Sequence, residues 1–400
     1  MQITILNQHH TNPDCPATSR HYSFLEQLTK RHKVTLVTTD GWRSARITNN
    51  YSWVPEGVEL HESTVPYANK MGVVQRLKSF AGFAAFSFKK AMELPKPDII
   101  WAVSTPLSTP WVAAQVAKLR GVPWVFEVQD LWPKFPIEMG AVKNKWLQQR
   151  LYVLEKSLYK SAAHIITLSP NMTDYVASLG ISRDKITTNY NGTDLNMIAA
   201  VKPAAVELLR ERYQLEGKRV VLYAGTYGRA NDIPTLMKAI EVLASEPEIK
   251  FVFTGSGYYE PQLQELAARM PNLLLLPPQN RQDTFELFKL ADLSLVTFSN
   301  LPVLAANSPA KFYDSLGCGT PVIVTNPGWT NSFVQKYNVG WYTPAEQHEL
   351  LAQTIKSALA DAAILQKKGA NGAIIAKEIF DRQMLVTKVE QVLQRAQQQS

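Results

Sequence analysis

The side chains best suited to bind a phosphate group lie in one segment of the second half of the chain. Residues 307–325 read NSPAKFYDSLGCGTPVIVT. The pattern predicts a helix that starts at an Asn/Ser cap with an early proline, ends at glycine and leads into a buried strand. Free amides at the helix start, together with Lys311, would hold a diphosphate, and Asp314 would accept hydrogen bonds from sugar hydroxyls. The alternative is a surface ion pair between these two side chains on one helix face.

Two glycine turns earlier in the same half could contact the same anion. The first begins at Gly225 after the run VVLYA, and the second begins at Gly255 after the next apolar run. Glycine lets the backbone approach a phosphate closely, and the helix that follows supplies free N–H groups. The phosphate-binding candidates here are Gly225, Thr226, Gly228, Arg229 and Gly255. The alternative is a tight strand-to-helix turn with a surface arginine.

In the first half, polar side chains follow the apolar run WVFEV at 124–128. Asp130 lies just beyond this predicted strand and is expected to orient an acceptor hydroxyl, although it could instead cap the turn. Glu127 lies inside the strand, where an unpaired carboxylate is costly, so it has either a partnered functional role or a structural salt bridge. Gln129 stands between them and cannot act as a base.

Two further residues are candidates on the acceptor side. Arg20 ends the polar loop 7–20 at a helix start and would bind an anionic acceptor, or it is an ordinary helix-start arginine. Ser104 ends the predicted strand 98–104. His9 and His10 lack further ligands at metal spacing, and no Asp-x-Asp element occurs, so we expect neither a metal nor another cofactor.

The elements that must position these residues form two series of buried strands separated by helical segments. The predicted strands cover 3–6, 34–39, 98–104, 124–128 and 164–169, then 220–224, 251–255, 273–277, 293–298 and 321–325. This alternation predicts an α/β protein with two doubly wound, Rossmann-like parallel sheets. We place the domains at 1–195 and 196–379, with a last helix at 380–398 that could pack back on the first. Ligands of such sheets bind beyond the carboxyl ends of the strands, so an interdomain cleft is the expected site.

Composition and charge narrow the class of protein. With 400 residues, 46% hydrophobic and 19% charged, the chain is neither disordered nor fibrous. Residues 1–200 hold 22 basic and 15 acidic residues, so +7 of the net +8 lies in the first half, which favours a polyanionic partner there. The two cysteines form no disulfide framework, and the start MQITILNQ reads as a strand rather than a signal peptide. We therefore expect a cytoplasmic location.

A basic, phenylalanine-rich segment at 74–92 accounts for part of this charge. We predict that it lies on an anionic membrane surface through Arg76, Lys78, Phe80, Phe83, Phe86, Lys89 and Lys90. The alternative is a helix packed on the sheet with its lysines in solvent. Nucleic acid is not expected as a partner, because the basic residues lack interleaved aromatic side chains on exposed strands.

The order of six segments resembles the retaining glycosyltransferases of family 4, which have the GT-B fold. The segments are DIIWAVSTPLSTP, FEVQDLWP, HIITLSPNMTDYVASLGI, NYNGTD, YAGTYGRAND and SPAKFYDSLGCGTPVIVT. The DLWP element is similar to the bacterial subgroup that builds lipid-linked surface polysaccharides and includes the N-acetyl-L-fucosamine transferases. The resemblance implies a metal-independent hexosyltransferase (EC 2.4) of O-antigen, capsule or exopolysaccharide assembly. It also implies a nucleotide-sugar donor, UDP-linked by default with GDP open, a polyprenyl-diphosphate-linked acceptor and a peripheral position on the inner face of the plasma membrane.

Several positions depart from the family pattern. Many members carry two glutamates where this chain has Ala306 and Asp314, so Asn307 and Ser308 are expected to supply donor contacts instead. The usual strand-end histidine falls on Gln129, which agrees with a reaction in which the departing phosphate takes the acceptor proton.

The family's usual Arg and Lys after the second domain's first strand fall on Thr226 and Asn231, so Arg229 and Lys311 are the expected substitutes. Two other functions stay open. One is a nucleotide-sugar 2-epimerase on the same fold, and the other is an inactive membrane-associated binding protein.

Overall fold

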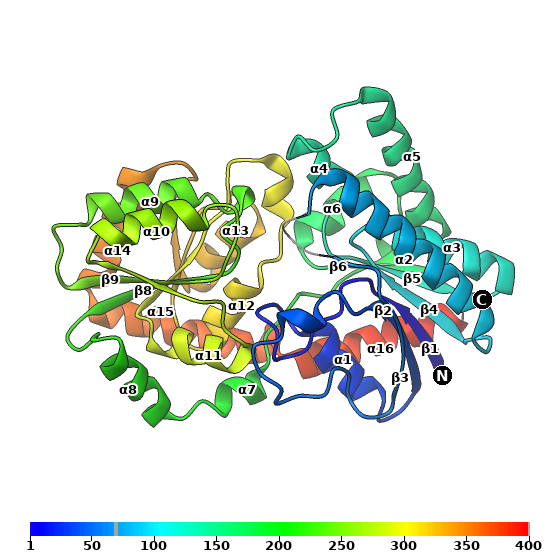
Figure 1. Cartoon of the computed structure of the whole chain (residues 1–400), viewed down its shortest axis with the longest axis horizontal. Helices are drawn as coiled ribbons and strands as arrows, with labels where there is room; N and C mark the ends of the chain where they lie inside the picture. The colour runs from blue at the N-terminus through cyan, green and yellow to red at the C-terminus, as the bar shows by residue number, and fades with distance from the viewer. Residues whose placement is uncertain (68–70, 399–400) are drawn as a thin grey trace. The chain divides into compact units, whose positions relative to one another are not determined.

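The structure, a computed structural model, describes residues 1–67 and 71–398 and separates them into two units (Figure 1). The first unit contains residues 1–190, 306–308 and 383–398, and the second contains residues 191–305 and 309–382. The chain thus leaves the first unit about five residues before the boundary placed at 195 from the sequence.

The first unit is built on a parallel sheet with the strand order β3-β2-β1-β4-β5-β6-β7. The strands are β1 (Gln2–Leu6), β2 (Lys33–Thr39), β3 (Val58–Ser63), β4 (Ile99–Val103), β5 (Trp124–Val128), β6 (His164–Thr167) and β7 (Ile186–Thr188). The helices are α1 (Arg20–Leu28), α2 (Val73–Glu93), α3 (Ser108–Arg120), α4 (Lys134–Glu138), α5 (Lys145–Ser161), α6 (Pro170–Ser178) and α16 (Arg382–Gln398). Because the strand order reverses between β1 and β4, the crevice at their carboxyl ends is open to a ligand.

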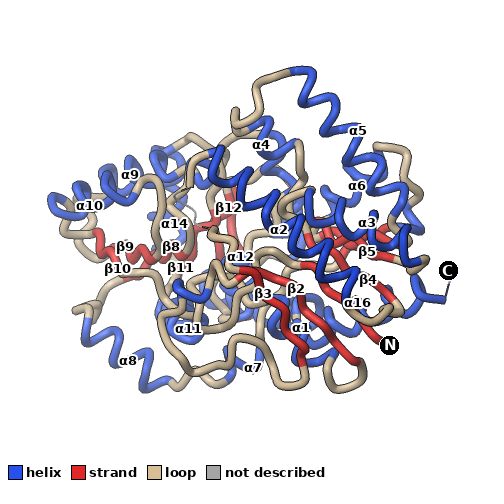
Figure 2. The backbone as a smooth tube through the Cα atoms, turned by 45° about the vertical axis from the view of Figure 1, so that its right-hand side comes forward, coloured by secondary structure: helices blue, strands red, loops and turns tan. Residues whose placement is uncertain are grey.

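The last helix, α16, packs against the first sheet. Its buried residues Leu385, Val389 and Val392 recur every three or four positions and therefore share one face. That face joins Ile3 and Ile5 of β1 in one hydrophobic cluster, to which α1 also contributes. Figures 1 and 2 show α16 and α1 beside these strands.

The second unit has a parallel sheet with the order β10-β9-β8-β11-β12-β13. Its strands are β8 (Arg219–Ala224), β9 (Ile249–Thr254), β10 (Leu273–Leu276), β11 (Leu293–Val296), β12 (Val322–Val324) and β13 (Gly340–Tyr342). Its helices are α7 (Leu195–Ala199), α8 (Pro203–Arg212), α9 (Ile233–Val242), α10 (Glu260–Arg269), α11 (Arg281–Leu290), α12 (Ala310–Gly317), α13 (Trp329–Tyr337), α14 (His348–Ala360) and α15 (Ala362–Ile375).

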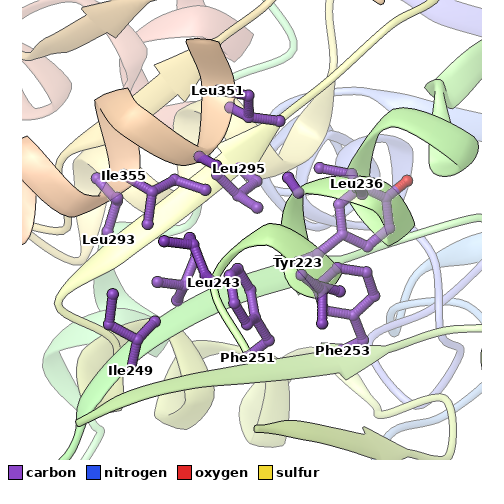
Figure 3. Close-up of a cluster of buried hydrophobic side chains, with 14 of the residues drawn as sticks. Tyr223, Leu236, Leu243, Ile249, Phe251, Phe253, Leu293, Leu295, Leu351 and Ile355 are labelled. Carbon is purple, nitrogen blue, oxygen red and sulfur yellow. The ribbon is translucent and has the colours of Figure 1, made fainter. Parts of the chain in front are cut away.

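Side chains of β8 alternate between the two faces of the second sheet, as the strand period of two requires. Val221 and Tyr223 join the cluster covered by α9 and α14, which Figure 3 shows. Val220 and Leu222 join the opposite cluster, covered by α11. Both faces are buried, and the prediction of two doubly wound parallel sheets is therefore confirmed.

Within residues 1–67 and 71–398, no helix has both the length and the apolar character needed to cross a bilayer.

Candidate functional site

The two glycine turns of the second unit pack against each other. The amide of Gly225 donates to the carbonyl of Thr254 at 2.9 Å, and the amide of Tyr227 donates to that of Ser256 at 2.9 Å. Gly255 has φ +146°, and a Cβ built there would lie 1.9 Å from the Gly225 carbonyl oxygen. The second turn therefore supports the first, and glycine is required at position 255 by sterics alone.

Lys311 on α12 extends into the space that Gly225 leaves open. A Cβ on Gly225 would lie 3.2 Å from Lys311 Nζ, which is itself 3.7 Å from the ring centroid of Tyr223. The Lys311 side chain is only 9% exposed, and Nζ has no hydrogen-bond partner among the described residues. Burial lowers its pKa to about 7. A buried amine without a counter-ion at the carboxyl end of a central strand is suited to receive an anion.

Asp314, one helical turn after Lys311, is engaged elsewhere. Its two oxygens accept a bidentate pair of bonds from Arg281 at 2.7 and 2.9 Å, and Oδ1 also accepts from Thr193 Oγ1 at 2.8 Å. Neither sequence-based alternative for Asp314 matches this geometry, because the carboxylate is neither paired with Lys311 nor open to sugar hydroxyls. Asp314 instead fixes α12, and with it Lys311, against the start of α11.

Arg281 was not among the site residues predicted from the sequence. A basic residue in the first turn of a helix opposes the helix dipole, and this was the one local sign that Arg281 needs an acidic partner.

The other residues predicted to bind the donor do not lie beside Lys311 in one cluster. Arg229 is exposed, with its guanidinium 4.2 Å above the ring of exposed Tyr258, and Thr226 is also exposed. Asn307 and Ser308 belong to the segment 306–308 of the first unit. Within the second unit, the structure thus brings Gly225, Gly255 and Lys311 together.

In the first unit, Arg20 and Glu127 form a buried ion pair. Arg20 Nε lies 3.3 Å from Glu127 Oε1, and Nη1 donates to the Tyr190 carbonyl. The residues are 1% and 0% exposed. Burial acts to raise the pKa of Glu127, but the charges of Arg20 and His21 outweigh it and the pKa falls to about 2. Both side chains are used inside the fold, so the expectations of an acceptor-binding Arg20 and a catalytic Glu127 are corrected to a structural pair.

Ser104 and Gln129 also have structural partners. The Ser104 hydroxyl accepts from the Gln129 amide at 3.1 Å and ties the ends of β4 and β5 together. The Gln129 side chain donates to Glu127 Oε1 at 3.3 Å.

Asp130 is the candidate in this group that remains available to a ligand. Among the described residues its carboxylate receives one long hydrogen bond, from Thr105 Oγ1 at 3.5 Å. Burial raises the pKa of its carboxyl group, as expected for an acid without a cationic partner.

A row of partly exposed aromatic rings lies at the same edge of the first sheet. We call it the aromatic strip; it consists of His9, Trp42, Tyr67, Phe80 and Trp132. Tyr67 is the centre, with ring-centroid distances of 4.2 Å to His9, 6.4 Å to Trp42 and 6.3 Å to Phe80, and Phe80 lies 5.9 Å from Trp132. Four of the five residues follow strand ends and one lies on α2.

Charged groups flank the aromatic strip. Burial raises the pKa of Tyr67, Arg76 opposes this and Asp130 adds to it, so both charges lie near the ring. Burial and Arg76 lower the pKa of His9 to about 4, which keeps it neutral at physiological pH. A role for His9 could not be predicted from the sequence, because its partner Tyr67 comes from a distant segment.

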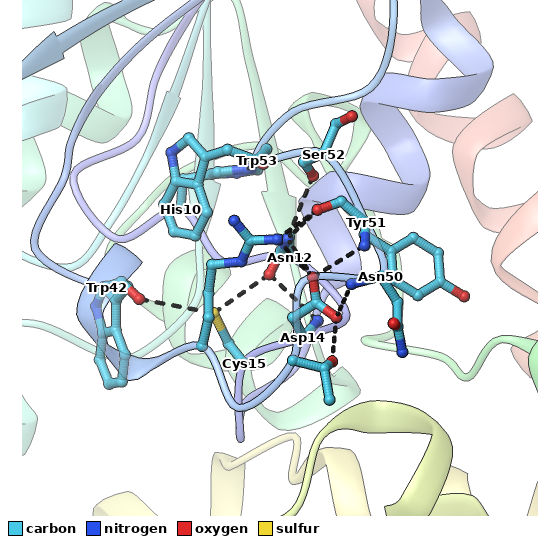
Figure 4. A network of polar contacts seen from close by, with 11 residues as sticks. His10, Asn12, Asp14, Cys15, Trp42, Asn50, Tyr51, Ser52 and Trp53 are labelled. Atoms are coloured by element: carbon cyan, nitrogen blue, oxygen red, sulfur yellow. Dashed lines mark hydrogen bonds and ion pairs between the residues drawn. The ribbon is translucent and has the colours of Figure 1, made fainter.

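The loop that carries His9 is held by a network of polar contacts (Figure 4). Asp14 accepts from Arg46 Nη2 at 2.8 Å, from the amides of Asn50 and Tyr51 at 3.1 and 3.0 Å, and from Thr48. These bonds fasten the loop after β1 to the loop after β2, so the loop is a rigid support rather than an open polar surface.

Helix α2 differs from the predicted interfacial helix. Phe83 is fully buried, Phe80 and Phe86 are partly buried, and Lys90 pairs with Glu93 at 2.8 Å. The phenylalanines face the rest of the unit because α2 packs on α3 and β2. The prediction that Phe83 enters a membrane is therefore wrong. Lys78 and Lys89 are exposed, as predicted for lysines in solvent. Arg76 Nε donates to the carbonyl of Met71 at 3.0 Å.

In the part of the chain that the structure describes, no group of three or more His, Cys, Asp or Glu side chains is arranged to hold a metal ion.

Family models match both halves of the chain. Residues 18–192 match the glycosyl transferase 4-like domain, and residues 206–377 match the glycosyl transferases group 1. The chain therefore belongs to the glycosyltransferases that combine these two domains and has the GT-B fold.

Individual relatives agree with this class. The chain is 26% identical over 266 residues to the "Putative colanic acid biosynthesis glycosyl transferase WcaI" of Escherichia coli K12; the match spans 64% of this chain and 65% of that protein. The fold is similar to that of sucrose-phosphate synthase from Thermosynechococcus elongatus, with a TM-score of 0.79, 18% identity and full coverage of both chains. It is also similar to Anabaena HepE in complex with UDP, with a TM-score of 0.71, 18% identity and coverage of 99% and 100%.

Proposed function

We propose that the protein transfers a sugar from a nucleotide-sugar, UDP-linked, to a lipid-linked glycan during the assembly of a bacterial surface polysaccharide. The observation that carries the donor assignment is the buried amine of Lys311 beside the Gly225 turn. A diphosphate would supply the missing counter-charge, and the amides of the turn would bind its oxygens. The UDP held by the structurally similar HepE and the role in polysaccharide synthesis named for WcaI support the choice of donor and pathway class.

The acceptor binds at the first unit. Sugar rings present apolar faces that stack on aromatic side chains, and the aromatic strip offers such a surface beside Asp130. Asp130 accepts a hydrogen bond from the attacking hydroxyl and orients it. Arg76, which lies near Tyr67 and His9, provides positive charge for the acceptor's diphosphate.

In the reaction, the bond between the anomeric carbon and the diphosphate oxygen breaks and a bond from that carbon to the acceptor oxygen forms on the same face of the sugar. The departing phosphate oxygen takes the acceptor proton. Lys311 stabilises the negative charge that develops on the diphosphate, which needs no metal ion.

The test measures the release of nucleoside diphosphate from UDP-sugars by the purified protein, with and without polyprenyl-diphosphate-linked glycans extracted from bacterial membranes. We expect release that depends on the acceptor. Conversion of the donor to an epimer without acceptor would instead identify a 2-epimerase, and an absence of UDP binding would refute the donor site.

A further inference from the structure

Helix α5 projects from the first unit with half its length uncovered. Only Glu155, Leu158 and Tyr159 are buried, and none of the residues before Glu155 is. In Figure 1 its beginning lies at the outer edge of the unit, away from the strands. An exposed start of this kind normally carries polar side chains toward water.

The exposed side of α5 instead carries large apolar side chains. Trp146 is 63% exposed, Val153 is 67% exposed and Leu147 is 42% exposed. Trp146 and Val153 are seven positions apart and therefore lie on the same side of the helix, about two turns from each other. Beside this side of the helix, a groove between α3 and α5 is lined by Trp111, which is 43% exposed, and by Leu154 and Ser157 of α5.

The exposed charges of this segment all have one sign. They belong to Lys143, Lys145, Arg150, Lys156 and Lys160. The one acid of α5, Glu155, is buried and accepts hydrogen bonds from the hydroxyls of Tyr159 at 3.1 Å and Tyr175 at 3.0 Å. The guanidinium of Arg150 lies 5.1 Å from the Trp146 ring centroid, so cations flank the apolar side chains directly.

We infer that this outward face of α5, formed by Lys145, Trp146, Leu147, Arg150, Val153, Lys156 and Lys160, docks the protein on an anionic lipid surface. Tryptophan, leucine and valine enter the boundary between headgroups and acyl chains, while the basic side chains remain among the anionic headgroups. The choice of a membrane as partner rests on the proposed lipid-linked acceptor, whereas the exposed apolar and basic face does not depend on it.

Helix α2 is the competing surface, because Val73, Val74 and Leu77 are also exposed there. Fewer exposed basic side chains accompany them, since Lys78 is exposed but Arg76 is partly buried. At the other end of α2, Lys89 and Lys90 both lie within 4 Å of Glu93, at 3.8 and 2.8 Å. The uninterrupted basic charge around exposed apolar side chains favours α5.

The experiment measures co-sedimentation of the full chain with vesicles of phosphatidylcholine, alone or mixed with phosphatidylglycerol. We expect binding only to the mixed vesicles and weaker binding at high salt. Lys156→Gln with Lys160→Gln should reduce the partition coefficient about 25-fold, since one basic residue contributes about fivefold near such a surface. Trp146→Ser with Val153→Ser should reduce it at least tenfold.

Matched controls separate the surface from general effects. Leu208→Ser removes an exposed leucine from α8 of the second unit, and Val74→Ser with Leu77→Ser alters α2. Both should bind vesicles like the unaltered chain, and all variants should keep their helical circular dichroism and UDP affinity.

Three results would overturn the inference: equal binding to both kinds of vesicle, release by the α2 variant but not by the α5 variants, or α5 variants that dissociate a dimer and leave vesicle binding intact. Vesicle binding by a chain that fails to bind UDP would refute the proposed function and leave this surface standing.

Discussion

Replacing Lys311 with methionine should stabilise the protein while weakening its hold on UDP. In the folded chain burial lowers the pKa of Lys311 from 10.5 to about 7. Between about pH 10.5 and 7, the lysine is protonated in the unfolded chain but neutral in the folded one. The free energy of unfolding therefore decreases as the pH falls through this range. At about 1.4 kcal/mol per pH unit, the cost at neutral pH reaches about 4 kcal/mol as an upper bound.

Methionine retains the apolar length of the side chain and removes the titrating group. We therefore expect Lys311→Met to raise the free energy of unfolding by about 1–3 kcal/mol at pH 7.5, seen as a rise of several degrees in the thermal midpoint. UDP affinity should fall about 10- to 100-fold with the loss of a charge-assisted contact. In the unaltered chain affinity should also fall as the pH rises above about 7, because neutral Lys311 must regain a proton to bind the diphosphate.

Calorimetric titration of UDP across this pH range, with thermal unfolding of the same samples, measures both effects. Lys238→Met, which removes an exposed lysine of α9, is the control and should change neither. A less stable Lys311→Met protein, or one with unchanged UDP affinity, would refute the assignment of Lys311 as an unpaired cation awaiting an anion.

Four other predictions concern two buried charged groups, the proposed acceptor surface and the expected independence from metal. Arg20→Met should destabilise the first unit by about 3–5 kcal/mol in urea unfolding, since the variant leaves Glu127 buried without the Arg20 guanidinium. Adding Glu127→Leu to the same chain should restore most of the lost stability. A single variant as stable as the unaltered chain would contradict the structural role of the pair. Burial raises the pKa of Glu155 to about 7, so stability should decline as the pH rises from about 4.5 to 7, and Glu155→Gln should abolish this decline and add up to about 3 kcal/mol at pH 8. Trp132→Ala should raise the KM for the glycan acceptor without changing UDP affinity, whereas equal losses in both would place Trp132 outside an acceptor site. EDTA should leave turnover intact, and a loss of activity that Mg²⁺ restores would show that the reaction needs a metal.

The fold was largely predictable because the central strands of both sheets are buried on both faces and appear as continuous apolar runs. The edge strands β3, β7 and β13 are only partly buried and were not predicted. β8, with Val220 and Tyr223 covered by opposite clusters, is an example. The boundary between the two domains and the position of the last helix were harder to predict. The apolar face of α16 could pack on either sheet if its sequence pattern alone is considered.

The site was less predictable because its decisive contacts join distant parts of the chain. Arg281 reaches Asp314 across 33 positions, and Arg20 reaches Glu127 across 107. Each pair removes a candidate from contact with ligands, and no local pattern shows this. Lys311 was identified because its helix start, proline and glycine lie in one short segment.

The exposed side chains of the first unit were also difficult to predict from the sequence. The phenylalanine-rich composition of α2 suggested an interfacial helix, but composition does not tell which side of a helix packs on the sheet. Phe83 is buried, whereas Trp146 and Val153 on α5 and Val74 and Leu77 at the start of α2 are exposed.

A crystal structure of the chain with UDP tests the donor site most directly. We predict a phosphate oxygen about 3 Å from Lys311 Nζ and within hydrogen-bond distance of a backbone amide in the Gly225 turn. UDP bound elsewhere, with Lys311 still lacking an anionic partner, would contradict the account.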